Sequence, residues 1–104
     1  IAPATIAPPG GESFADLVKR TGDAMQRVVE THRGRKVIAV AHGGTIRAAL
    51  SIALDIDPEA ALAFQVENVS VTRMDHIDDT RDGGAWRIPF VNRMFRPRSA
   101  GQDF

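Results

Sequence analysis

His42 is the residue of this chain whose type and position point most directly to chemistry. It follows the apolar run VIAVA at 37–41 and precedes Gly43 and Gly44, after which apolar residues recur at helical spacing. An imidazole can donate a hydrogen bond to an anion or transfer protons near neutral pH. Glycines allow a close backbone approach, and a helix start offers unpaired amides and positive partial charge. These features predict a site for a phosphoryl or carboxylate group, although a polar cap on a core strand followed by an ordinary glycine turn fits the same residues.

The elements expected around His42 alternate between helix and strand. Ser13 is placed to cap a helix with an apolar stripe, which ends before Gly34. Unbroken apolarity at 37–41 is typical of a strand buried on both faces, as in a parallel sheet. A second helix then runs to Leu54. This alternation predicts an α/β fold, with an open, mostly parallel sheet and helices on both of its faces.

Shorter elements are expected in the second half of the chain. Their predicted order is a helix from Pro58 to about Leu62, one or two strands within 64–74 broken near Asn68, a polar loop at 75–84, a strand at 85–91 placed at an edge by Pro89, and a basic tail at 93–104.

Length and composition limit the classes of function. A chain of 104 residues, 43% hydrophobic and 25% charged, fits one globular domain over 1–104, with an extended lead-in at 1–12. Thirteen Lys and Arg balance thirteen Asp and Glu, so we expect neither nucleic acid nor an anionic membrane as partner. The absence of cysteine excludes disulfides and a thiol nucleophile. Without a signal-peptide pattern or an apolar run of about 20 residues, we expect a cytoplasmic protein.

Several stretches resemble one known family. VIAVAHGGTIRAAL, residues 37–50, closely resembles the second histidine motif of the histidine phosphatase superfamily, the phosphoglycerate mutase-like proteins. PPGGESFADLVKRTGDAM at 8–25 resembles the segment that opens a helix in its bacterial phosphatases, and FQVENVSVTRMDH with WRIPFVNRMF resembles its last strands. The motifs keep the family order over nearly the whole chain. The resemblance implies the C-terminal half of a phosphoglycerate mutase-like α/β domain.

The resemblance also implies roles for particular residues. The family uses two histidines, of which one, in an N-terminal Arg-His-Gly motif, is phosphorylated during turnover. By resemblance His42 is the second, catalytic histidine, which binds the transferring phosphoryl group, and the Gly43 amide binds the same group. Glu12 and Ser13 would border the substrate pocket by the same resemblance, although helix capping is the interpretation that we favour for them. The family needs no metal or organic cofactor.

The sequence departs from the family pattern in one important respect, because it contains no Arg-His-Gly. The segment 31–34, Thr-His-Arg-Gly, has similar letters in another order and falls at an expected helix C-terminus, where the dipole repels phosphate. His32 is therefore not expected to be a nucleophile. Arg47, one turn into the second helix, is expected on a solvated face.

The sequence therefore supports two hypotheses of different classes. The first is a phosphatase or phosphomutase acting on a small phosphorylated metabolite, a hydrolase or isomerase whose nucleophilic half is missing, so that this chain alone is inactive. The alternative is a non-catalytic α/β module that binds an anion or a protein. The partners expected are a small phosphorylated substrate and either a missing N-terminal half or a second copy in a homodimer.

Overall fold

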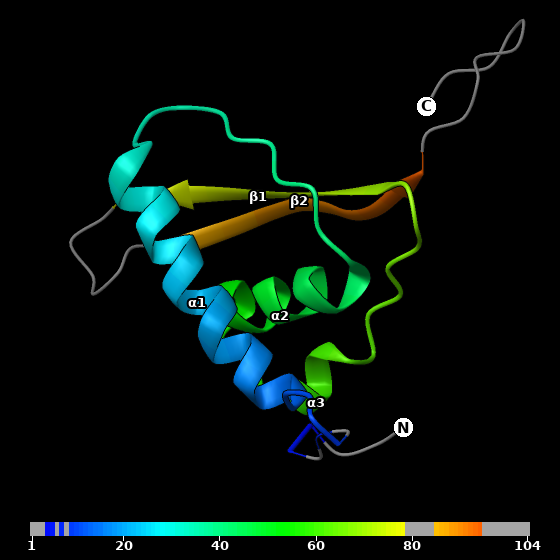
Figure 1. Cartoon of the computed structure of the whole chain (residues 1–104). Helices are drawn as coiled ribbons and strands as arrows, with labels where there is room; N and C mark the ends of the chain where they lie inside the picture. Colours follow the sequence, from blue (N-terminus) through cyan, green and yellow to red (C-terminus); the bar gives the residue numbers. More distant parts are fainter. Residues whose placement is uncertain (1–3, 6, 8, 79–84, 95–104) are drawn as a thin grey trace, which may run out of the picture.

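The computed structural model describes residues 4–5, 7, 9–78 and 85–94. In chain order the elements are α1 (Phe14–Thr31), α2 (Gly43–Leu54), α3 (Pro58–Ala61), β1 (Ser70–Ile77) and β2 (Ala85–Met94). Figure 1 shows α2 and α3 on one side of the two strands, with α1 running obliquely past them. Within the described ranges, no helix combines the length and apolar character needed to cross a bilayer.

Helix α1 begins where the sequence predicts. The Ser13 hydroxyl accepts a hydrogen bond of 3.1 Å from the Asp16 amide, and the Asp16 carboxylate accepts one of 3.3 Å from the Ser13 amide. This reciprocal capping box satisfies two amides that the first helical turn leaves unpaired. At the other end the Arg35 amide donates to the His32 carbonyl, and Gly34 takes a φ of 73° that glycine adopts without steric cost.

The core is centred on α2. Its middle turn is buried, and Leu50 is the largest fully buried side chain among the described residues. A side-chain carbon at Gly22 would lie 3.1 Å from Ile52 Cδ1, and one at Gly44 would lie 3.7 Å from Leu17 Cδ2. The two contacts occur in the same order along both helices, because Leu17 precedes Gly22 in α1 and Gly44 precedes Ile52 in α2. Gly22 of α1 therefore lets Ile52 of α2 approach closely, and the two helices cross with their N-terminal ends on the same side.

The sheet differs from the one expected. Within the described residues, β1 pairs with β2 in antiparallel orientation, and the expected open parallel sheet is not observed. β2 has ten residues against eight in β1, and the register shifts between Val71 and Arg73 and again between Arg73 and Asp75. Each shift corresponds to one extra residue of β2, which makes a bulge. Pro89 lies in one bulge, where its missing amide costs no ladder hydrogen bond.

The run at 37–41 is the largest departure from expectation. It forms no strand, and it leaves Ile38 93% and Val40 99% exposed. A continuous apolar run is buried in a sheet only when neighbouring strands and helices cover it, and none of the described elements does so here. The prediction of a buried strand is therefore wrong for this chain taken alone.

The boundaries of the later elements are also corrected. The expected strand within 64–74 begins only at Ser70, and it continues to Ile77, inside the expected loop. β2 extends to Met94, so the first two residues of the expected basic tail are part of a strand. The rest of that tail, 95–104, and the expected loop at 79–84 lie outside the described residues. The short helix at Pro58 and the break near Asn68 are confirmed.

Candidate functional site

His42 is the residue immediately before the first turn of α2. Its backbone is extended, with φ −76° and ψ 159°, and its carbonyl accepts a hydrogen bond from the Ile46 amide. Its imidazole makes no capping hydrogen bond, and the residue is exposed. An exposed imidazole thus stands at the positive end of a twelve-residue helix, where the predicted anion site requires it.

Gly43, the first residue of α2, lies close to the segment that follows α3. A side-chain carbon at this position would be 3.3 Å from the Val66 carbonyl oxygen and 3.2 Å from Arg47 Nη1. Its φ lies outside the left-handed region, so space rather than backbone conformation favours glycine here. The start of α2 is therefore held against 64–66 without an intervening side chain.

Arg47 contributes to the same contact. Its Nε donates a hydrogen bond of 2.7 Å to the Phe64 carbonyl oxygen, and the bond is partly buried. The expected solvated position on the helix face is therefore wrong. A guanidinium lies between the first turn of α2 and the chain that leaves α3.

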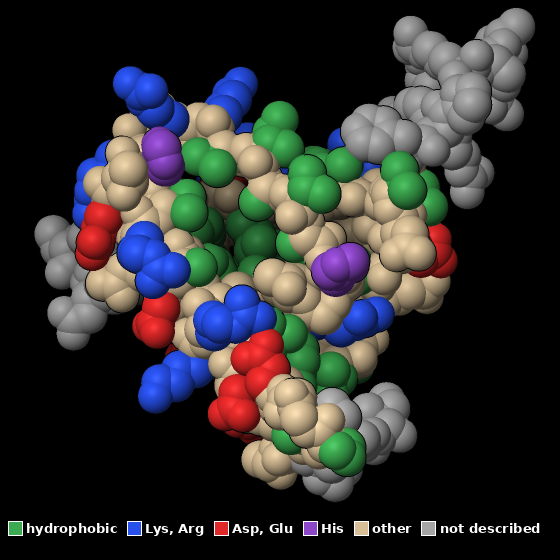
Figure 2. Space-filling view, viewed as in Figure 1, with side chains coloured by type: hydrophobic (Ala, Val, Ile, Leu, Met, Phe, Trp, Pro, Cys, Tyr) green, Lys and Arg blue, Asp and Glu red, His purple; other side chains and the backbone are tan. Residues whose placement is uncertain are grey.

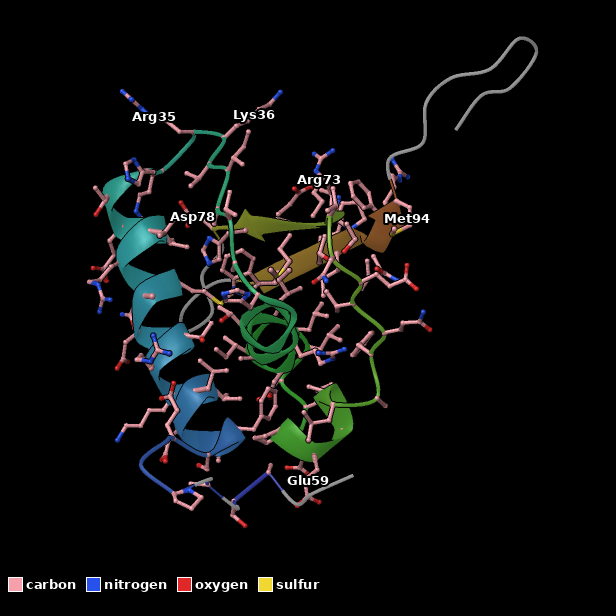
Figure 3. All side chains as sticks on the ribbon, turned by 45° about the vertical axis from the view of Figure 1, so that its right-hand side comes forward. Arg35, Lys36, Glu59, Arg73, Asp78 and Met94 are labelled. Carbon is pink, nitrogen blue, oxygen red and sulfur yellow. The ribbon has the colours of Figure 1, made fainter. Side chains whose placement is uncertain are left out.

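The segment 35–42 connects α1 to this site. Just before this segment, Arg33 Nη1 lies 2.6 Å from a carboxylate oxygen of Asp78, the residue that follows β1. Just after it, Gly43 lies against Val66. Figure 2 shows a hollow between α1 and this segment, with hydrophobic side chains on its floor and Lys and Arg side chains further out on the same face. Figure 3 shows Arg35 and Lys36 pointing outward from the molecule.

Glu12 and Ser13 have structural partners at the start of α1. Ser13 is buried in the capping box, and Glu12 accepts a hydrogen bond of 2.7 Å from Arg20 Nη2. This hydrogen bond, together with the charge of Glu12, raises the pKa of the Arg20 guanidinium. The capping role of Ser13 is confirmed, whereas contact of either residue with a substrate stays a prediction.

Asn92 is a structural residue that the sequence analysis did not single out. It takes a φ of 56° in a bulge of β2, and its side-chain oxygen accepts a hydrogen bond of 2.8 Å from the Glu67 amide. Its own amide donates to Thr72 Oγ1. Asparagine tolerates the left-handed region better than most residues, which is the signal that could have identified it. Asn92 thereby ties β2 to the turn that leads from 64–66 into β1.

The fold and the candidate site together define an α/β protein with a histidine at the start of a glycine-led helix. A family model described as histidine phosphatase superfamily (branch 1) matches residues 2–89. The chain belongs to this superfamily. The chain is 40% identical over 74 residues to the metal-independent phosphoserine phosphatase of Arabidopsis thaliana. It is 31% identical over 80 residues to the probable phosphoglycerate mutase GpmB of Yersinia enterocolitica.

A solved structure shows the same fold. Bacillus stearothermophilus YhfR superposes with a TM-score of 0.69 at 26% identity, covering 86% of this chain and 42% of that one. The match to the Arabidopsis phosphatase covers 71% of this chain and 29% of the relative, and the Yersinia match covers 77% and 37%. The chain thus spans about a third of the length of the curated relatives that it matches.

Proposed function

We propose that this chain forms one side of a phosphoryl-transfer site, in which His42 and the Gly43 amide bind the phosphoryl group of a small phosphorylated metabolite. The observation that carries the proposal is the exposed imidazole at the start of α2 in a member of the histidine phosphatase superfamily. The helix start supplies unpaired amides and positive partial charge, and the imidazole adds a donor. Phosphoryl transfer depends mainly on such positioning and charge compensation.

The reaction that we propose is that of a phosphatase or a phosphomutase. The names of the two relatives given above include phosphoserine and phosphoglycerate, which are both phosphate esters of small acids. In such a reaction the nucleophilic histidine attacks phosphorus while the bond to the ester oxygen breaks. His42 and Gly43 then bind phosphoryl oxygens. The sequence has no Arg-His-Gly, so the attacking histidine would come from residues outside this chain, and the chain alone would not turn over.

A second candidate function is a non-catalytic module that binds an anion at the same helix start. The exposed imidazole and the free amides of the helix start support it equally, because binding an anion needs no nucleophile. Phosphate binding by the full-length protein, measured by calorimetry, together with no hydrolysis of phosphate esters by the same protein, would distinguish this function from the first.

We also propose that 37–41 becomes a strand of a parallel sheet in the completed domain. Exposure of Ile38 and Val40 leaves a strand-length apolar segment without cover, and the match covers only 29% and 37% of the two relatives, so most of their chain lies outside it. We propose that a strand from the remaining part of the domain pairs with 37–41. We also propose a cytoplasmic location for the protein. A hybrid in which residues 2–89 replace the matched part of Bacillus stearothermophilus YhfR tests the pairing. Slow amide exchange at 37–41 in the folded hybrid is expected, whereas rapid exchange there would contradict it.

The phosphoryl site is tested by titrating the chain with orthovanadate and inorganic phosphate in a calorimeter. His42→Ala is compared with His32→Ala, a matched change at an exposed histidine that lies at a helix C-terminus. We expect loss of His42 to weaken binding by about tenfold, the effect of a charge-assisted hydrogen bond, and loss of His32 to leave binding unchanged. Absence of binding, or equal effects of the two changes, would refute the proposed site. Formation of phosphohistidine with steady turnover by the chain alone would refute the proposal that the attacking histidine lies outside this chain.

A further inference from the structure

Arg47 lies where it can control the geometry of the candidate site. It is one turn inside α2, and helical side chains of this length point back toward the helix N-terminus. Its Nη1 accordingly lies beside Gly43, 3.2 Å from where a side-chain carbon would be. The positive charge of the guanidinium therefore sits at the positive end of the helix, close to the amide that the proposed function assigns to phosphate.

The guanidinium also joins two separate parts of the chain. Its Nε donates to the Phe64 carbonyl oxygen at 2.7 Å, while the Val66 carbonyl oxygen approaches Gly43. The planar fork of arginine fixes the direction of each donor, which a lysine ammonium does not do. One side chain thus holds 64–66 and the first turn of α2 in a fixed relation.

We propose that Arg47 is a positioning residue of the phosphoryl site. By holding Phe64 it fixes the backbone at Gly43, so that the Gly43 amide faces the anion together with His42. Its charge adds to the positive potential at the helix start, which favours a doubly charged phosphate. This proposal rests on the proposed function, because it concerns the same site.

The test measures orthovanadate affinity and the free energy of unfolding on the same variants. Arg47→Met removes both charge and hydrogen bond, Arg47→Lys keeps the charge, and Arg27→Met is the control at an exposed arginine of α1. We expect Arg47→Met to weaken vanadate binding about tenfold, Arg47→Lys to recover part of that loss, and Arg27→Met to match the unaltered chain. If Arg47 had only a structural role, Arg47→Met would lower the free energy of unfolding, and Arg47→Lys would not recover vanadate affinity.

A second measurement on the unaltered chain guards against a variant that does not fold. Nuclear magnetic resonance follows the Arg47 Nε–H and Gly43 amide signals during a vanadate titration. We expect both signals to shift with the same dissociation constant. The inference is overturned if neither signal moves at saturation, or if folded Arg47→Met binds vanadate as tightly as the unaltered chain. If neither Arg47→Met nor His42→Ala weakens vanadate binding, the proposed function fails. If His42→Ala weakens binding and Arg47→Met does not, only the role of Arg47 is refuted.

Discussion

Gly43 packs directly against the backbone of Val66, because a side-chain carbon at position 43 would lie 3.3 Å from the Val66 carbonyl oxygen. A backbone carbonyl cannot rotate away as a side-chain end can. The neighbouring Gly44 meets only Leu17 Cδ2 at an ordinary contact distance of 3.7 Å. Position 43 is therefore too crowded for a side-chain carbon, whereas position 44 has room for one.

This difference predicts opposite effects of alanine at the two positions. Gly43→Ala is expected to lower the free energy of unfolding by about 1–3 kcal/mol, the usual cost of overpacking. Gly44→Ala is expected to raise it by up to about 1 kcal/mol through helix propensity. Urea denaturation followed by circular dichroism measures both changes. Equal effects of the two substitutions would contradict the contact with Val66.

The capping box at Ser13 gives a second prediction. Ser13→Ala removes the hydroxyl that accepts from the Asp16 amide and is expected to cost about 1 kcal/mol of stability. Ser13→Thr keeps an acceptor oxygen and should recover most of that loss. Denaturant midpoints of the three proteins provide the comparison. A threonine variant as unstable as the alanine variant would show that burial of Ser13, rather than capping, matters.

Val69 gives a third prediction, since it has a φ of 59° although it is β-branched and 82% exposed. The left-handed region costs such a residue roughly 1–2 kcal/mol. Val69→Asn is therefore expected to raise the melting temperature. Val28→Asn, within α1, is the control and should lower it, because the partly covered apolar side chain of Val28, 41% exposed, is replaced by a polar one with no relief of backbone strain. Destabilisation by both substitutions would show that Val69 makes contacts that offset its strain.

The exposed segment 37–41 gives the fourth prediction. Ile38→Lys and Val40→Lys remove apolar side chains that contact almost nothing in this chain, so they should leave its unfolding free energy within about 0.5 kcal/mol. Both should reduce self-association in sedimentation velocity, because the apolar surface is lost. Leu50→Lys, in the core, should unfold the chain. Strong destabilisation by a lysine at position 38 or 40 would show that this segment is buried in solution.

Local signals in the sequence predicted the helices well. The cap at Ser13 and the proline at the start of α3 act within a few residues, so the sequence is sufficient to place them. The same holds for His42 at the start of α2. These features depend on backbone amides and short side chains close in sequence.

The strands and the contacts around the site depend on distant parts of the chain. Burial of 37–41 requires neighbours that the described elements do not supply, so apolarity alone misled the prediction. β1 extends to Ile77 because it pairs with Ala85 and Trp86, and no local pattern indicates this. The bond from Arg47 to Phe64 spans seventeen residues, and a solvated helix face was the simpler expectation.

The two bulges of β2 determine on which side a larger sheet can grow. Irregular spacing of donors and acceptors, with Pro89 among them, makes the outer margin of β2 a poor template for another strand. The other margin of the pair belongs to β1, which has no extra residue at either register shift. β2 therefore fits the outermost position of an extended sheet, and its shape discourages fibre-like stacking of one molecule on the next through that strand.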